Sequence, residues 1–191
     1  VYIIKRKYND RTGPREIAES RARRILFQRT PQTCGPKGED PVIALLQRCR
    51  EASVECGGEL VSRIGEGYAV LLGVAKGDTE REVELLAKKI AELRVFEDEN
   101  GKMNRSILET GGAALVVPNF TLCADCSHGR RPSFFDAMLP REASGLYEYF
   151  LKKLRYYGIG EVRGGVFGGD MQVRIQNDGP VTISLDTADL Q

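Results

Sequence analysis

Two short segments of the sequence combine backbone breaks with polar side chains that could act on a substrate. In VVPNFTL, residues 116–122, an apolar strand runs into Pro118, which has no N–H for a strand ladder, and Asn119 and Thr121 follow. In NDGPVT, residues 177–182, the hairpin signal Asp-Gly is followed directly by proline, and such bonds also admit the cis isomer. By spacing alone, each segment favours a structural role, the first as an edge strand and the second as a turn.

The sequence offers one clear candidate for a hydroxyl nucleophile but no clear base to activate it. Thr121 is the obvious nucleophile, but a hydroxyl needs an adjacent base, and the sequence has no recognisable base beside it. The only histidine is His128, in a polar CSHGR segment that is typical of an exposed loop. A Ser-His-Asp triad would have to use it, and the chain has no G-x-S-x-G elbow.

Cys123 and Cys126 form a lone C-x-x-C. A structural zinc site needs four ligands, so it would have to add His128 and one distant cysteine. A redox pair is expected where a strand opens a helix, whereas Gly, Arg and Pro follow here. We therefore expect neither a metal nor a cofactor. The cysteines number five, an odd count that favours a reducing cytosol over a disulfide framework.

The charges are balanced overall but unevenly distributed. Lys and Arg number 28 and Asp and Glu 27, so the formal charge is +1, which excludes a whole-molecule polyanion binder but not a local basic patch. Residues 1–41 carry ten basic and five acidic side chains, and the remainder of the chain is acidic. No apolar run approaches the ~18 residues that a membrane span needs.

A loop-like composition that ends at Pro41 predicts a domain boundary there. Residues 1–41 form either an RNA-binding arm or an extension without a core of its own. Residues 42–187 are expected to form one compact domain, and residues 188–191 a short tail.

The strands that must position the two segments are predicted from apolar runs and alternation. A hairpin turn is expected at Gly57-Gly58. In the tail, residues 171–175 and 181–185 alternate on either side of the NDGP break, which predicts an antiparallel pair. Further strands are expected at 42–46, 60–64, 68–74 and 114–117.

Two helices are predicted from caps and apolar stripes. Thr79 and Glu82 have the spacing of a capping box, and an apolar face follows them. Pro140 suits the first position of a second helix, which Gly158 ends. Helices interspersed with strands predict an α+β fold, with mixed or antiparallel β-sheets and two main helices.

Taken together and in this order, the segments resemble the D-aminoacyl-tRNA deacylase family, formerly called D-tyrosyl-tRNA deacylases. The resemblance covers residues ~42–187 and none of residues 1–41. PNFTL at 118–122 stands where the family has S-Q-x-T-L. The other similar blocks are LQRCREASV (46–54), LRVFEDENGKMN (93–104), GRRPSF (129–134), FGGDMQV (167–173) and NDGPVT (177–182).

The resemblance implies a hydrolase that cleaves the ester between a D-amino acid and tRNA, accepts glycyl-tRNA and rejects L-aminoacyl-tRNA. This is a proofreading step in cytoplasmic translation. The resemblance also implies a homodimer with active sites at the subunit interface. A cis Gly179–Pro180 bond would reach into the partner's pocket and hold the substrate ammonium with backbone carbonyls, while its bulk blocks an L side chain.

The family pattern also assigns expected roles within the site. Backbone N–H groups of Phe120 and Thr121, beside Asn119, would stabilise the oxyanion, each for ~2.7–4 kcal/mol. The ribose 2′-hydroxyl of the substrate would assist the attack, and Thr121 would position or polarise. The remaining expected contacts are Arg48, Phe167 and Met171 for the terminal adenosine, and Lys102, Arg130 and Arg131 for phosphates of the acceptor end.

The replacement of Ser-Gln by Pro118-Asn119 leaves two alternatives. A related deacylase type that removes L-alanine mischarged on tRNA has P-Q-A-T-L and a trans Gly-Pro turn, although Phe120 and NDGPVT match the D-specific type. In the second alternative, the shorter Asn119 disables the pocket and leaves a non-catalytic tRNA-binding dimer.

Overall fold

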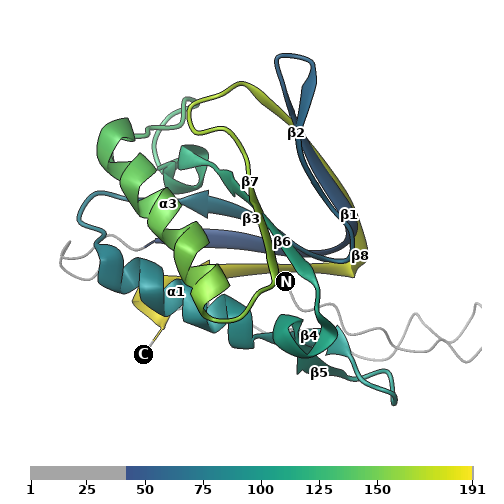
Figure 1. The fold of residues 1–191 in the computed structure, drawn as a ribbon. Helices are drawn as coiled ribbons and strands as arrows, with labels where there is room; N and C mark the ends of the chain where they lie inside the picture. Colours follow the sequence, from purple (N-terminus) through teal and green to yellow (C-terminus); the bar gives the residue numbers. More distant parts are fainter. Residues whose placement is uncertain (1–41, 191) are drawn as a thin grey trace, which may run out of the picture. The chain divides into compact units, whose positions relative to one another are not determined.

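The computed structural model describes residues 42–190, so both interpretations of residues 1–41 lie outside the described residues. Six strands form one sheet in the order β2-β1-β3-β6-β7, with β8 paired to β1 (Figure 1). β1 is antiparallel to β2, β3 and β8, whereas β3–β6 and β6–β7 are parallel. The strands are β1 (Ile43–Cys56), β2 (Glu59–Ile64), β3 (Gly67–Gly73), β6 (Ala113–Pro118), β7 (Glu161–Gly164) and β8 (Met171–Asp186).

Two helices cover one face of this sheet (Figure 1). α1 (Glu80–Glu92) begins with the predicted capping box, in which the Thr79 N–H donates to Glu82 Oε2 over 3.0 Å and Thr79 accepts from the Arg81 N–H. α3 (Pro140–Tyr156) begins with proline at its first position, as predicted. The α+β class with two main helices is therefore confirmed.

The apolar stripes of the helices build the main core. Leu86 and Ile90 of α1 and Phe150 and Leu154 of α3 are fully buried against Leu46, Val70 and Val116 of the sheet. A smaller cluster on the other sheet face contains Val54, Leu115 and Val117, which half-buried residues of β8 cover in part. Between α1 and β6 lie the hairpin of β4 (Arg94–Glu97) and β5 (Met103–Ser106) and the short α2 (Ile107–Thr110).

The predicted antiparallel pair in the tail is wrong. β8 is one strand that runs through the NDGP segment, and both of its halves are antiparallel to β1. Cys49 pairs with Asn177 and Gln47 with Thr182, so four residues of β8, 178–181, stand opposite Arg48 alone. The Asp-Gly signal here marks a bulge, because a neighbouring strand is already present to continue the pairing on both sides of it.

The end of the described chain packs against the domain. The short helix η2 (Thr187–Asp189) crosses the predicted limit at residue 187, and Leu190 lies against the main core. Among residues 42–190, no helix has the length and apolar character needed to cross a membrane.

Candidate active site

A pocket of about 390 Å³ lies between the end of β6 and the start of α3. β6 pairs with β3 as far as Pro118, and the Asn119 N–H then donates to the Leu72 carbonyl over 2.7 Å. The chain turns there into the short 3-10 helix η1 (Phe120–Cys123). The pocket wall is mostly apolar and includes Pro118, Asn119, Phe120, Phe134, Tyr147 and Phe167.

Asn119 caps η1 and engages Thr121 twice. Its Oδ1 accepts the Thr121 N–H over 3.3 Å and the Thr121 hydroxyl over 2.5 Å. Phe120 is the first residue of η1, a position whose N–H has no acceptor within its own helix. The wall thus offers the Phe120 N–H as a backbone donor, while the N–H and the hydroxyl of Thr121 both point to an amide oxygen and not to a base.

Aromatic rings surround this wall. Phe120 is 57% exposed and meets Phe134 edge to face, with ring centroids 5.1 Å apart. Phe167 lies 6.0 Å from Tyr147, whose hydroxyl donates to the carbonyls of Val116 (3.1 Å) and Gly165 (3.3 Å). Burial raises the pKa of Tyr147 to about 12, so it remains a neutral donor. The apolar spacing of α3 predicts Tyr147 as a core residue and gives no sign of its place in the pocket.

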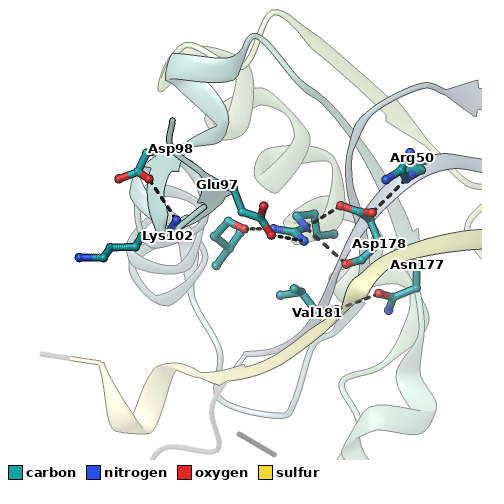
Figure 2. Close-up of polar contacts among 9 residues, drawn as sticks. Arg50, Glu97, Asp98, Lys102, Asn177, Asp178 and Val181 are labelled. Atoms are coloured by element: carbon teal, nitrogen blue, oxygen red, sulfur yellow. Dashed lines mark hydrogen bonds and ion pairs between the residues drawn. The ribbon is translucent and has the colours of Figure 1, made fainter. Parts of the chain in front are cut away.

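The bulge of β8 projects outward. The Gly179–Pro180 bond is cis, Gly179 has φ +118°, and both residues are exposed. Asn177 fixes the base of the bulge, because its Oδ1 accepts the Val181 N–H over 3.0 Å (Figure 2). Its Nδ2 also donates to the Thr182 hydroxyl over 3.0 Å.

Arg48 lies beneath the bulge, only 6% exposed. Its Nη1 donates to the Val95 carbonyl over 2.6 Å, and its Nε lies 3.1 Å from Asp178 Oδ2 and 3.3 Å from the Asp178 carbonyl. Glu97 adds a longer ion pair at 3.7 Å, and the exposed Arg50 holds the other Asp178 oxygen at 3.0 Å (Figure 2). The structure therefore places Arg48 where it supports the backbone next to Gly179.

A second, more polar pocket of about 680 Å³ lies beside the bulge, lined by Arg48, Arg50, Glu66, Glu97, Asp178 and Gly179 among others. It shares no lining residue with the first pocket. One chain therefore brings Asn119, Phe120 and Phe167 together, and separately Arg48 and Gly179. Met171 lines neither pocket, and its sulfur accepts the Val166 N–H over 3.2 Å.

The three cations expected at phosphates come from two separate loops. Lys102 lies in the β4–β5 turn, where its N–H donates to Asp98 Oδ1 over 3.0 Å (Figure 2). The same oxygen accepts the Asn100 N–H over 2.9 Å. These bonds, the Lys102 N–H foremost, lower the pKa of Asp98. Arg130 and Arg131 belong to the segment before α3, which lies at the opposite end of the domain from the β4–β5 hairpin (Figure 1).

In the Cys123–Cys126 motif, Cys123 is buried and Cys126 is exposed. In residues 42–190 no group of three or more His, Cys, Asp or Glu side chains is arranged to hold a metal ion.

Comparisons with known proteins agree on one family. The family described as "D-Tyr-tRNA(Tyr) deacylase" matches residues 45–186. A protein of Thermomicrobium roseum named "D-aminoacyl-tRNA deacylase" is 56% identical over 77% of this chain and 95% of its own length. A protein of Thermus aquaticus with the same name is 53% identical over 76% of this chain and 95% of its own.

Two solved structures share the fold. One, named "c-Myc DNA Unwinding Element Binding Protein", has a TM-score of 0.71 and 46% identity over 75% of this chain and 97% of its own. Another, described as a "probable eukaryotic D-amino acid tRNA deacylase", has a TM-score of 0.65 and 18% identity over 76% of this chain and 99% of its own, and supports the fold alone. The family match spans most of the described domain and both candidate segments, and the chain belongs to the D-Tyr-tRNA(Tyr) deacylase family.

Proposed function

We propose that this protein hydrolyses the ester that joins a D-amino acid, or glycine, to the 3′ end of tRNA and spares the L-aminoacyl ester. The observation that carries the proposal is the identity of 56% and 53%, over nearly the full length of two relatives, to proteins named D-aminoacyl-tRNA deacylase. The first pocket, with a backbone donor at Phe120 on a mostly apolar wall, supports it.

The ester carbonyl is proposed to lie against η1, where the Phe120 N–H stabilises the negative charge that develops on its oxygen. The Thr121 N–H, whose bond to Asn119 Oδ1 is a long 3.3 Å, would be shared between that oxygen and the oxyanion. Asn119 holds Thr121 in place through both of its hydrogen bonds. Among the described residues, no carboxylate, histidine or lysine hydrogen-bonds the Thr121 hydroxyl. We therefore assign the activation of water to the ribose 2′-hydroxyl of the substrate, with Thr121 as a positioning residue.

A second copy of the chain is proposed to complete each site. Gly179 and Pro180 are exposed, and Gly179 lines a different pocket from Asn119 and Phe120. Within one chain, the residues proposed to select the D-amino acid therefore lie apart from those proposed to hydrolyse the ester. In a homodimer, the bulge of one subunit would enter the pocket of the other. Its carbonyls would hold the substrate ammonium, and its bulk would exclude an L side chain.

Arg48 is proposed to act on the bulge rather than on the terminal adenosine. Phe167, in the pocket wall, is the better candidate for adenosine contact, and Met171 would support the adjacent loop through Val166. Lys102, Arg130 and Arg131 are proposed to hold phosphates, with the two loops contributed by different subunits.

The domain limits and the location are also proposals. We assign deacylase activity to residues 42–187, with residues 188–191 as a tail, and place the protein in the cytoplasm, where translation supplies charged tRNA. Residues 1–41 carry no assigned role.

A paired assay tests the proposal. Purified protein should release D-tyrosine from charged tRNA and leave the L ester intact. Inertness toward both esters would contradict it, and release of L-alanine from mischarged tRNA would favour the related L-specific type.

The second candidate function is tRNA binding without hydrolysis. One specific observation favours it, because a relative that is 46% identical is named for binding a DNA element. It predicts salt-sensitive tRNA binding and no hydrolysis. Restored hydrolysis in Asn119→Gln would then identify the shorter side chain as the cause.

A further inference from the structure

Phe135 is an exposed aromatic ring directly beside the pocket. It is 76% exposed, yet its neighbour Phe134 lines the pocket and packs edge-on against Phe120. Ala137, Met138 and Leu139, which follow it, line the same pocket. The Phe135 ring therefore lies at the rim of the pocket, and residues before and after it in the sequence line the pocket wall.

One face of this ring is already occupied by a cation. The Lys76 ammonium lies 3.5 Å from the ring centroid, within the range of a cation–π interaction. In the part of the chain that the structure describes, Lys76 forms no ion pair and Phe135 makes no second ring contact. The opposite face of the ring is thus available for a flat partner.

Backbone hydrogen bonds hold the segment that carries Lys76 beside the segment that carries Phe135. The Lys76 N–H donates to the Asp136 carbonyl over 2.8 Å, and the Met138 N–H donates to the Val74 carbonyl over 3.0 Å. Ala75 and Ala137 form an antiparallel bridge between these two bonds. A preformed platform of this kind loses little freedom when a ligand binds.

Two further cations lie on the same segment. Asp125 and Ser133 exchange backbone hydrogen bonds of 2.8 and 2.9 Å, which close the loop that carries Arg130 and Arg131 just before Phe134. An exposed ring flanked by unpaired cations is the combination with which proteins bind unpaired nucleotides: bases stack on the ring and phosphates meet the cations.

We propose that Phe135 stacks the base that precedes the terminal adenosine of tRNA, with Lys76 fixing the ring from its other face. The inference rests on the proposed function, in which the terminal nucleoside occupies the pocket. The strand then has to leave the pocket over its rim, and Phe135 is the exposed ring on that rim. Stacking does not select among bases, so the contact would serve every tRNA.

Two substrates isolate this contact: D-tyrosyl-tRNA and a D-tyrosyl ester of adenosine alone, which lacks the preceding base. In Phe135→Ala, the ratio of kcat/KM for tRNA to kcat/KM for the adenosine ester should fall about tenfold, mainly through KM. Phe135→Trp should retain the wild-type ratio, and Phe135→Leu should not, because a leucine side chain cannot stack.

Tyr156 provides a matched control. It is also 76% exposed and also lies under a lysine, with Lys153 Nζ 5.1 Å from its centroid, but it belongs to the C-terminal end of α3, away from the pocket. Tyr156→Ala should leave the ratio unchanged. A tRNA with an abasic penultimate position should cost the wild-type protein the same tenfold and cost Phe135→Ala nothing further.

Other outcomes would overturn the stacking contact. In Phe135→Ala, an equal loss of kcat/KM on both substrates would contradict the stacking contact, and so would no loss on either substrate when the wild type is active. Both outcomes would leave the proposed function in place. A changed oligomeric state in Phe135→Ala would assign the ring to a subunit contact instead. Inertness of the wild type toward both substrates would remove the proposed function, and the stacking contact with it.

Discussion

The two strand breaks of the proposed site are held in opposite ways. At the end of β6, Asn119 caps η1 and binds Thr121, only two residues away. In β8, Asn177 closes the base of the bulge locally, but the bulge is also held by Arg48, which lies 130 positions before Asp178 in the chain and is buried beneath it. The pocket wall proposed for hydrolysis is thus stabilised by neighbours in the sequence. The bulge of β8, proposed to select the D-amino acid, depends in addition on a charge contributed by another strand. Substitutions should separate these two kinds of support.

Removal of one backbone donor should have the largest effect on activity. Phe120→Pro deletes the N–H at the first position of η1, where proline fits the backbone, so the fold should persist. kcat should fall by about 10²–10³-fold in a D-tyrosyl-tRNA assay. Phe120→Ala, which keeps the N–H and loses the ring, is the control, and an equal loss in both variants would argue against an oxyanion role.

Loss of the long-range support should come next, and should appear in stability. Arg48→Met leaves Asp178 and the Val95 carbonyl without their buried partner and should cost about 2–3 kcal/mol in urea unfolding. Arg50 binds the same carboxylate from an exposed position, so Arg50→Met should cost less than about 1 kcal/mol. Similar costs for the two variants would show that the bulge does not depend on burial of Arg48.

Gly179→Ala should have a smaller effect that still exceeds that of a comparable glycine elsewhere. An added Cβ would lie 2.8 Å from Val181 Cγ2 at a φ of +118°, which should cost about 2 kcal/mol in unfolding and impair D-ester hydrolysis. Gly77 has φ +90° with open space around it, so Gly77→Ala should cost about 1 kcal/mol and spare activity. If both variants hydrolysed the ester at the wild-type rate, the bulge would not be part of the site.

The smallest effect is expected at Thr121. Thr121→Ala removes one hydrogen bond to Asn119, worth about 1 kcal/mol, and should keep kcat within about tenfold of the wild type. Thr121→Ser should restore the loss. Abolished hydrolysis with intact tRNA binding in Thr121→Ala would make the threonine a nucleophile after all.

The same contrast explains how far the sequence could be interpreted. The cap of α1, proline at the start of α3 and the break at Pro118 all depend on neighbours within a few residues, and all appear in the structure where they were predicted. The alternation around NDGP predicts a turn between paired strands, because Asp-Gly marks a hairpin and a bulge alike. Only the presence of β1 along both halves of β8 distinguishes them.

The contacts that the sequence missed are those between distant segments. Arg48 was identified as a site residue from family resemblance, but its position beneath Asp178 requires the pairing of β1 with β8. Tyr147 has the spacing of a core residue, and only its hydroxyl, bound to Val116 and Gly165, distinguishes it from the rest of the stripe.

The most direct test of the central claim, that the bulge of one subunit completes the pocket of another, is complementation between two defective chains. Gly179→Ala keeps the pocket wall, and Phe120→Pro keeps the bulge. Co-expressed in equal amounts, they should form mixed dimers with one intact composite site and recover up to about a quarter of wild-type D-tyrosyl-tRNA hydrolysis. Activity that stays at the average of the two separate variants would contradict the shared site.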